Sequence, residues 1–140
     1  MTERLNAKKD YPLADKKPEL IFTPTGKKMG EITMESVLAG DIKIDDCRIS
    51  AQTLEYQAQI SESAGNKQMA ANLRRAAELT LFPDERVLEI YGALRPFRST
   101  KEDLIEIVDE LEEKGATLNA DFIRQAIEVY QRRNKLKGDK

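Results

Sequence analysis

The feature that most constrains the fold is the stretch from Pro83 to Gly115, which carries the start and stop signals of two consecutive helices. Asp84 supplies an acceptor and a negative charge to the first turn of the first helix, where free N–H groups and the helix dipole favour both. Pro96 disfavours the helical conformation in the residue before it, so this helix is expected to end at Leu94 or Arg95. The stretch therefore predicts a helix, a corner and a second helix.

The second helix of this pair is expected to begin after the corner at residues 95–98. Ser99 and Glu102 have the spacing of a capping box, in which each side chain accepts from the other residue's backbone N–H. Apolar residues then recur with the 3.6-residue helical period up to Gly115, a residue suited to the left-handed stop. These apolar residues are Leu104, Ile107, Val108 and Leu111.

Four further segments have helical signals. Thr33 and Gly40 bracket a short helix, and Ser50 is the N-cap of a helix that reaches Gly65. A third runs over residues 66–82, and Asn119 is expected to cap the last helix, whose apolar face includes Phe122, Ile123 and Tyr130. Ile42 and Ile44 suggest coil or a brief strand. The sequence predicts an all-α fold, a single compact domain of about five main helices and one short one.

Residues 1–32 are expected to form an extended arm, and residues 33–140 the helical domain. Pro12, Pro18 and Pro24 disfavour regular helix in the arm, while its apolar residues need a surface to cover. The arm could cover the chain's own core or lie along another subunit, and the second reading is favoured because disordered segments can become ordered on binding.

Composition excludes several classes of function. The 140 residues have a formal net charge of -2, so no nucleic-acid-coating protein is indicated, and one cysteine allows no disulfide framework. No apolar run suits a membrane span or a signal peptide, so a cytosolic protein is expected. The chain has no histidine, which removes the commonest general base and metal ligand. It is poorly equipped for catalysis alone.

Three groups of charged or reactive residues suggest a chemical role but have a simpler structural interpretation. The acidic residues between Glu102 and Glu113 are interpreted as a solvated helix face and not as a cation site. The basic residues from Arg132 to Lys140 are interpreted as compensation of a helix dipole followed by a frayed tail. Cys47 is expected to be a buried or half-buried thiol with no reactive role.

Arg95 and Arg98 flank Pro96 and Phe97 at the corner, and guanidinium groups make directional hydrogen bonds to carboxylates. One interpretation is an anchor for another protein. The other is local: Arg95 caps its own helix and Arg98 pairs with an acidic residue at position 102 or 103. Both remain open at this point.

Short runs along nearly the whole chain resemble the small (gamma) subunit of the coenzyme B12-dependent diol and glycerol dehydratases. The matching runs are residues 10–14 (DYPLA), 23–27 (TPTGK), 48–50 (RIS), 52–58 (QTLEYQA), 74–79 (RRAAEL), 83–86 (PDER), Tyr91 and 93–99 (ALRPFRS). Several ordered matches of this kind are more specific than any single motif.

The resemblance implies a heterohexamer of two large (alpha), two medium (beta) and two small subunits. In that family the large subunit is a TIM barrel that holds the substrate and a metal ion, and adenosylcobalamin lies between the large and medium subunits. The reaction converts a vicinal diol, glycerol or 1,2-propanediol, to an aldehyde and water by a radical mechanism. The small subunit is a helical partner of the large one, so no catalytic, cofactor-binding or metal-binding residue is expected on this chain.

Two details favour the glycerol type. The run Gln52–Ala58 resembles glycerol-type chains more closely, and only ten residues precede Tyr11, whereas diol-type small subunits often carry a longer extension associated with encapsulation. A cytoplasmic enzyme outside any microcompartment is therefore expected.

The expected role is assembly and stabilisation of the large subunit, without contact to nucleic acid or membrane. The alternative is a free-standing regulatory or nucleic-acid-binding protein that uses the basic C-terminal tail. The proposed subunit interface consists of Tyr11, Pro12, Leu13, Phe22, Leu94, Arg95, Pro96, Phe97 and Arg98.

Overall fold

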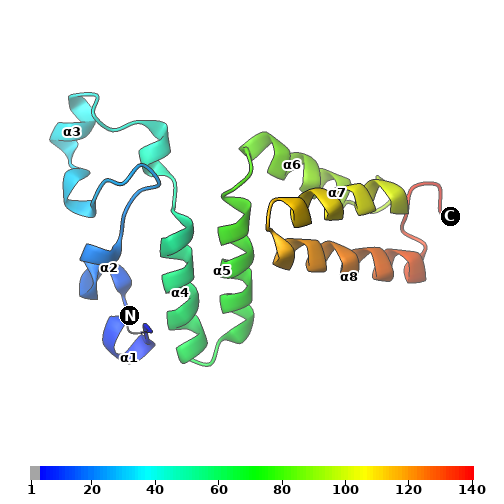
Figure 1. Ribbon diagram of the computed structural model, residues 1–140, viewed down its shortest axis with the longest axis horizontal. Coiled ribbons are helices and arrows are strands. Elements are labelled where there is room, and N and C mark those ends of the chain that lie inside the picture. Colours follow the sequence, from blue (N-terminus) through cyan, green and yellow to red (C-terminus); the bar gives the residue numbers. More distant parts are fainter. Residues whose placement is uncertain (1–3) are drawn as a thin grey trace. The chain divides into compact units, whose positions relative to one another are not determined.

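Helices account for the regular structure of the chain, as the sequence predicts (Figure 1). The structure is a computed structural model that describes residues 4–140, and the first three residues of the predicted arm lie outside the described part. Between residues 4 and 140 there is no strand, only a single bridge between Phe22 and Lys28. The helices are α1 (Ala7–Asp10), α2 (Leu13–Lys16), α3 (Met34–Leu38), α4 (Ala51–Ser63), α5 (Lys67–Leu79), α6 (Asp84–Ala93), α7 (Lys101–Glu113) and α8 (Thr117–Arg133), with 3-10 turns η1 (Pro18–Leu20), η2 (Met29–Glu31) and η3 (Ile44–Cys47).

The predicted helix inventory is confirmed by α4 to α8 as the five main helices and by α3 as the short one. Within this all-α fold the contacts group the chain into two units, Met1–Ala77 and Glu78–Lys140, called here the N-terminal and C-terminal units. The predicted boundary between an arm (residues 1–32) and a helical domain (residues 33–140) stays a prediction. The structure places the arm and α4 in the same unit, because side chains of the arm pack on that helix.

In the N-terminal unit the arm folds back on α4. Leu5 and Leu13 form a buried cluster with Ile60, and the backbone N–H of Leu5 donates to Gln59 Oε1 at 3.1 Å. The expectation that this segment lacks regular helix is wrong for α1 and α2, each one turn long. Asn6 explains α1: its side chain accepts from Lys9 N at 3.1 Å and satisfies a free donor of the first turn.

Helix α4 begins at the predicted cap, where Ser50 Oγ accepts from Thr53 N at 3.2 Å. It runs beside α5 (Figure 1), and Arg74 of α5 joins the two by pairing with Glu55 at 3.1 Å and Glu62 at 2.7 Å. These ion pairs are partly exposed, so each stabilises the helix pair only modestly.

The loops between α2 and α4 meet at the buried carboxylate of Asp46. It accepts from Lys27 Nζ at 2.8 Å, from the Lys43 backbone N–H at 2.7 Å, and from the Thr25 hydroxyl. Of the predicted coil or strand, Ile42 is coil and Ile44 begins η3, which carries Asp46. Cys47 beside it is exposed, so the expectation of a buried or half-buried thiol is wrong.

The core of the C-terminal unit lies between α6, α7 and α8, and the last two run side by side (Figure 1). Leu104 and Leu111 of α7 and Ile123 of α8 are its most buried large side chains. Charged residues fasten its edges. Arg86 of α6 forms a bidentate pair with Glu110, and Arg124 of α8 reaches Glu112 at 2.6 Å. The acidic run is therefore only in part a solvated face.

Two predicted caps are wrong by one or more residues. Helix α7 begins after Thr100, which forms the capping box with Asp103, whereas Ser99 is buried and its hydroxyl donates to Ala93 O at 2.8 Å. A buried Ser99 cannot cap the helix because its hydroxyl is used to close the preceding turn.

Asn119, the expected cap of α8, lies inside its first turn. The capping carboxylate comes instead from Glu78, forty residues earlier, which accepts from Leu118 N and Asn119 N at 2.9 Å each and from Asn119 Nδ2 at 2.8 Å. A carboxylate at this position satisfies free N–H groups and interacts favourably with the helix dipole.

We expect Glu78→Ala to lower the free energy of unfolding by about 1 kcal/mol, because it leaves these donors without their acceptor. Urea unfolding of the full chain, followed by circular dichroism, measures the change. Glu106→Ala is the matched control, since Glu106 is an exposed glutamate of α7. Equal unfolding midpoints for the two variants would show that Glu78 does not stabilise α8.

Candidate subunit interface

The nine predicted interface residues fall into two groups, one in each unit. Tyr11, Pro12, Leu13 and Phe22 belong to the N-terminal unit, and Leu94, Arg95, Pro96, Phe97 and Arg98 belong to the C-terminal unit. Each group forms part of a surface of its own unit, and each surface has a different chemical character.

Three of the four residues in the N-terminal group are exposed. Tyr11 is 65% exposed, Phe22 is 40% exposed, and Pro12 is also on the surface. Leu13 differs, because it is only 7% exposed and packs in the cluster with Ile60. The structure therefore uses Leu13 for the chain's own core and leaves little of it for a partner.

Phe22 lines a groove of about 350 Å³ in the N-terminal unit, together with Met29, Ile32 and Ile49. The same unit also exposes apolar side chains that do not line the groove, namely Met34, Val37, Leu38 and Ile44. None of these four residues belongs to the interface predicted from the sequence. The signal was present in α3, because a five-residue amphipathic helix cannot bury its apolar face by itself.

The buried carboxylate of Asp46 holds one wall of this groove. The hydrogen bond from Lys27, together with those from Lys43 N and Thr25, lowers the pKa of Asp46 from 3.8 to about 2. The carboxylate is therefore ionised at neutral pH, and its charge strengthens the hydrogen bonds that join the loops.

In the C-terminal unit, the corner after α6 is a tight turn. Leu94 ends the helix, Arg95 N donates to Gly92 O at 3.2 Å, and Arg98 N donates to Arg95 O at 3.2 Å. Within this turn Phe97 has a φ of 66°, in the left-handed region that phenylalanine rarely adopts. Such a backbone persists only where surrounding contacts enforce it.

The C-terminal tail provides these contacts. Phe97 N donates to Lys135 O at 2.7 Å, Lys137 N donates to Ser99 O at 2.8 Å, and Lys135 Nζ lies 5.1 Å from the centre of the Phe97 ring. The Tyr130 hydroxyl also donates to Leu94 O. The prediction of a frayed tail is therefore wrong: residues 135–137 are bound to the corner. Their binding needed Asn134 to adopt a left-handed conformation that ends α8.

Both arginines of the corner are exposed. Among the residues that the structure describes, neither guanidinium forms a hydrogen bond or an ion pair. The two local roles considered from the sequence, a cap by Arg95 and a pair of Arg98 with residue 102 or 103, are thus not found. Phe97 between them is 45% exposed. The corner presents two cations and an aromatic ring to its surroundings.

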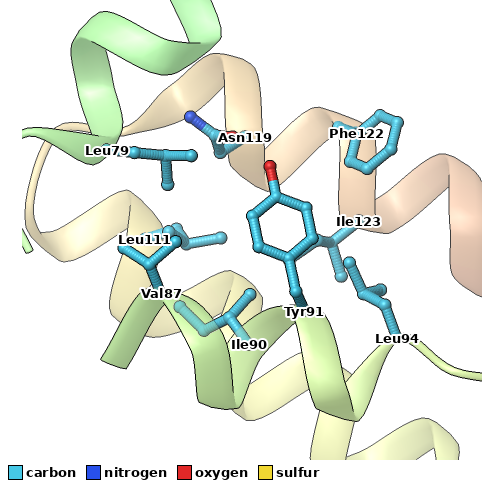
Figure 2. Close-up of a pocket in the computed structure, with 9 residues that line it drawn as sticks. All are labelled: Leu79, Val87, Ile90, Tyr91, Leu94, Leu111, Asn119, Phe122 and Ile123. Atoms are coloured by element: carbon cyan, nitrogen blue, oxygen red, sulfur yellow. The ribbon is translucent and has the colours of Figure 1, made fainter. Parts of the chain in front are cut away.

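A shallow apolar hollow between α6 and α8 adjoins Leu94 (Figure 2). The Tyr91 ring crosses it with its hydroxyl directed toward α8, and Phe122 stands at its edge (Figure 2). Its volume of about 10 Å³ suits about one water and no larger ligand. The hollow is lined by Leu79, Val87, Ile90, Tyr91, Leu94, Leu111, Asn119, Phe122 and Ile123.

Metal-ligating residues do not converge in the described part of the chain. From residue 4 onward, no three or more Cys, Asp or Glu side chains lie together as a possible metal site. Over the same residues, no helix combines the length and apolar character needed to cross a membrane.

Comparison with known proteins identifies the family. The profile described as "Dehydratase small subunit" matches residues 6–137. The propanediol dehydratase small subunit of Salmonella typhimurium is 49% identical over 139 residues, covering 99% of this chain and 80% of that protein. The protein of the same name from Citrobacter freundii is 50% identical over 131 residues, covering 93% and 76%. The chain belongs to the dehydratase small-subunit family.

The membership confirms the family resemblance seen in the sequence. Both relatives carry the name of propanediol dehydratase and not of glycerol dehydratase.

We expect Asp46→Asn to lower the thermal unfolding temperature at neutral pH. The folded pKa of Asp46 is depressed, so its stabilising effect is complete above pH about 4 and disappears as the pH falls through about 2. The difference between wild type and variant should shrink across that window, and calorimetry at several pH values measures it. Asp41→Asn, at an exposed aspartate, is the control. A difference that does not change with pH would contradict the assignment.

Proposed function

We propose that this chain is the non-catalytic small subunit of a dehydratase complex that converts a vicinal diol to an aldehyde and water. The match of the family profile over residues 6–137 carries this proposal. The role is assembly and stabilisation of the large subunit. Exposed apolar residues in the groove of the N-terminal unit and the exposed arginines of the corner support it, because both suit contact with another protein.

The proposed partners are a large (alpha) and a medium (beta) subunit in a two-two-two heterohexamer. Both relatives are named as small subunits, which supports the existence of larger partner subunits. We place the complex in the cytoplasm, and the exposed free thiol of Cys47 fits a reducing compartment.

We propose adenosylcobalamin as the cofactor of the complex, bound by the other subunits, with a radical mechanism. When bound to those subunits, the cofactor would supply the radical chemistry of the reaction. The residues of this chain do not fit a site for it or for a metal ion: the sequence has no histidine, and carboxylates do not converge within residues 4–140. No catalytic step is assigned to this chain.

The proposed substrate class is the vicinal diols. The run Gln52–Ala58 favours glycerol, whereas the names of the two relatives favour 1,2-propanediol. Under our proposal the substrate pocket belongs to another polypeptide, so the small subunit does not set the preference between the two diols.

The assembly role predicts that the large and medium subunits, produced without this chain, lose most of their soluble yield and turnover. Adding the chain should restore turnover at least about tenfold, because partner binding stabilises the folded state by mass action. The isolated chain should turn over neither diol. Full activity of the large and medium subunits alone would overturn the assembly role.

A subunit exchange tests the substrate assignment. Replacing this chain in the complex by the small subunit of the Salmonella relative should leave the ratio of kcat/KM for glycerol and 1,2-propanediol unchanged within about twofold. The absolute rates report assembly and serve as the control. A changed ratio would mean that this chain helps to form the substrate pocket.

A further inference from the structure

We infer that the corner at residues 95–98 binds a partner surface that presents carboxylates on either side of an apolar depression, with Phe97 as the central anchor. The inference rests on the proposed function, since it specifies the chemistry of the contact with a dehydratase subunit. It extends that function by naming what the partner must offer and which segment of this chain holds the anchor in place.

The charge around the corner determines which charge the partner surface must carry. The segments 95–103 and 132–140 contain eight basic and three acidic residues. Two of the acidic residues are already engaged: Asp103 accepts from Thr100 N at 3.0 Å and faces Lys137, and Asp139 accepts from Leu136 N at 2.8 Å. Glu102 is the third acidic residue, so the two segments together have a surplus of positive charge.

The arginines determine the kind of acceptor. Arg95 and Arg98 are exposed and make no side-chain pair among the described residues, so their donors are available to a partner. Guanidinium groups bind carboxylates through two parallel hydrogen bonds, a geometry that lysine cannot reproduce. Two such groups flanking one aromatic ring match a common composition of interface hot spots.

The backbone conformation of Phe97 supports the inference independently of the charges. A left-handed phenylalanine is unfavourable, and the chain maintains it with a hydrogen bond from Phe97 N to Lys135 O and a cation–π contact from Lys135 to the ring. Although these contacts enforce the conformation, Phe97 remains 45% exposed. A strained residue that is held firmly and yet not buried is one whose orientation serves a contact outside the unit.

The tail therefore acts as a positioning segment. Lys137 N donates to Ser99 O, and Leu136 between the two lysines packs on the core of the C-terminal unit. Residues 135–137 thus join the anchor to the core. Because the ring is held before binding, the partner does not have to immobilise it, which favours affinity.

The test measures the affinity of the full chain for the purified large and medium subunits at several salt concentrations. We expect Arg95→Gln/Arg98→Gln to raise Kd at least about tenfold and to reduce its dependence on salt. Lys67→Gln/Lys114→Gln removes two exposed lysines elsewhere in the chain and should stay within about twofold of wild type. If the arginine variant also stays within twofold while wild type binds, the inference is overturned and the proposed function stands. If wild type does not bind, the proposed function fails, and the inference with it.

Phe97→Gly separates an anchor from a structural residue. Glycine accepts a φ of 66° without strain, so the unfolding temperature should equal or exceed that of wild type while Kd rises at least about tenfold. A lower unfolding temperature with unchanged Kd would show that the ring serves the fold, and would overturn its role as an anchor.

Discussion

The packing of α7 against α8 is the contact on which the C-terminal unit depends. Leu104 and Leu111 are fully buried, and Ile123 meets them from α8. Burying side chains of this size is the main source of stability in a unit of about sixty residues. Helix α8 ends where Asn134 adopts a left-handed conformation, and Tyr130 and the tail contact the corner after α6.

Hydrogen bonds connect this packed core to the surface of the unit. The Tyr130 hydroxyl reaches the end of α6, and Lys135 and Lys137 reach the backbone of the corner. These bonds hold an exposed ring and two exposed cations in a defined geometry. The N-terminal unit uses the buried carboxylate of Asp46 in a similar way, to join loops whose apolar side chains remain exposed.

This arrangement agrees with a protein that functions as part of a complex. The chain forms two small cores and still exposes large apolar residues, among them Tyr11, Leu38 and Ile44. A subunit that is stabilised by partners does not need to bury all its apolar residues by itself. Family membership and surface chemistry therefore support the same proposal from independent observations.

The sequence by itself determined the five main helices and the short α3, most of their ends and the family. These signals are local or are carried by ordered runs: Ser50 and Thr33 cap their own helices, and Pro96 ends α6 from within a few residues. The corner was also recognisable, because Pro96 restricts the backbone of the residue before it.

Only the tertiary structure decided which residues that are far apart in the sequence contact each other. Glu78 caps α8 across forty residues, Leu13 turns inward onto α4, and the tail returns to Phe97. Neither a helical period nor a capping rule links such pairs, because their partners are chosen by packing between elements. The presence of Phe97 at the corner could be read from the sequence, whereas the orientation of its ring depends on contacts that the sequence does not predict.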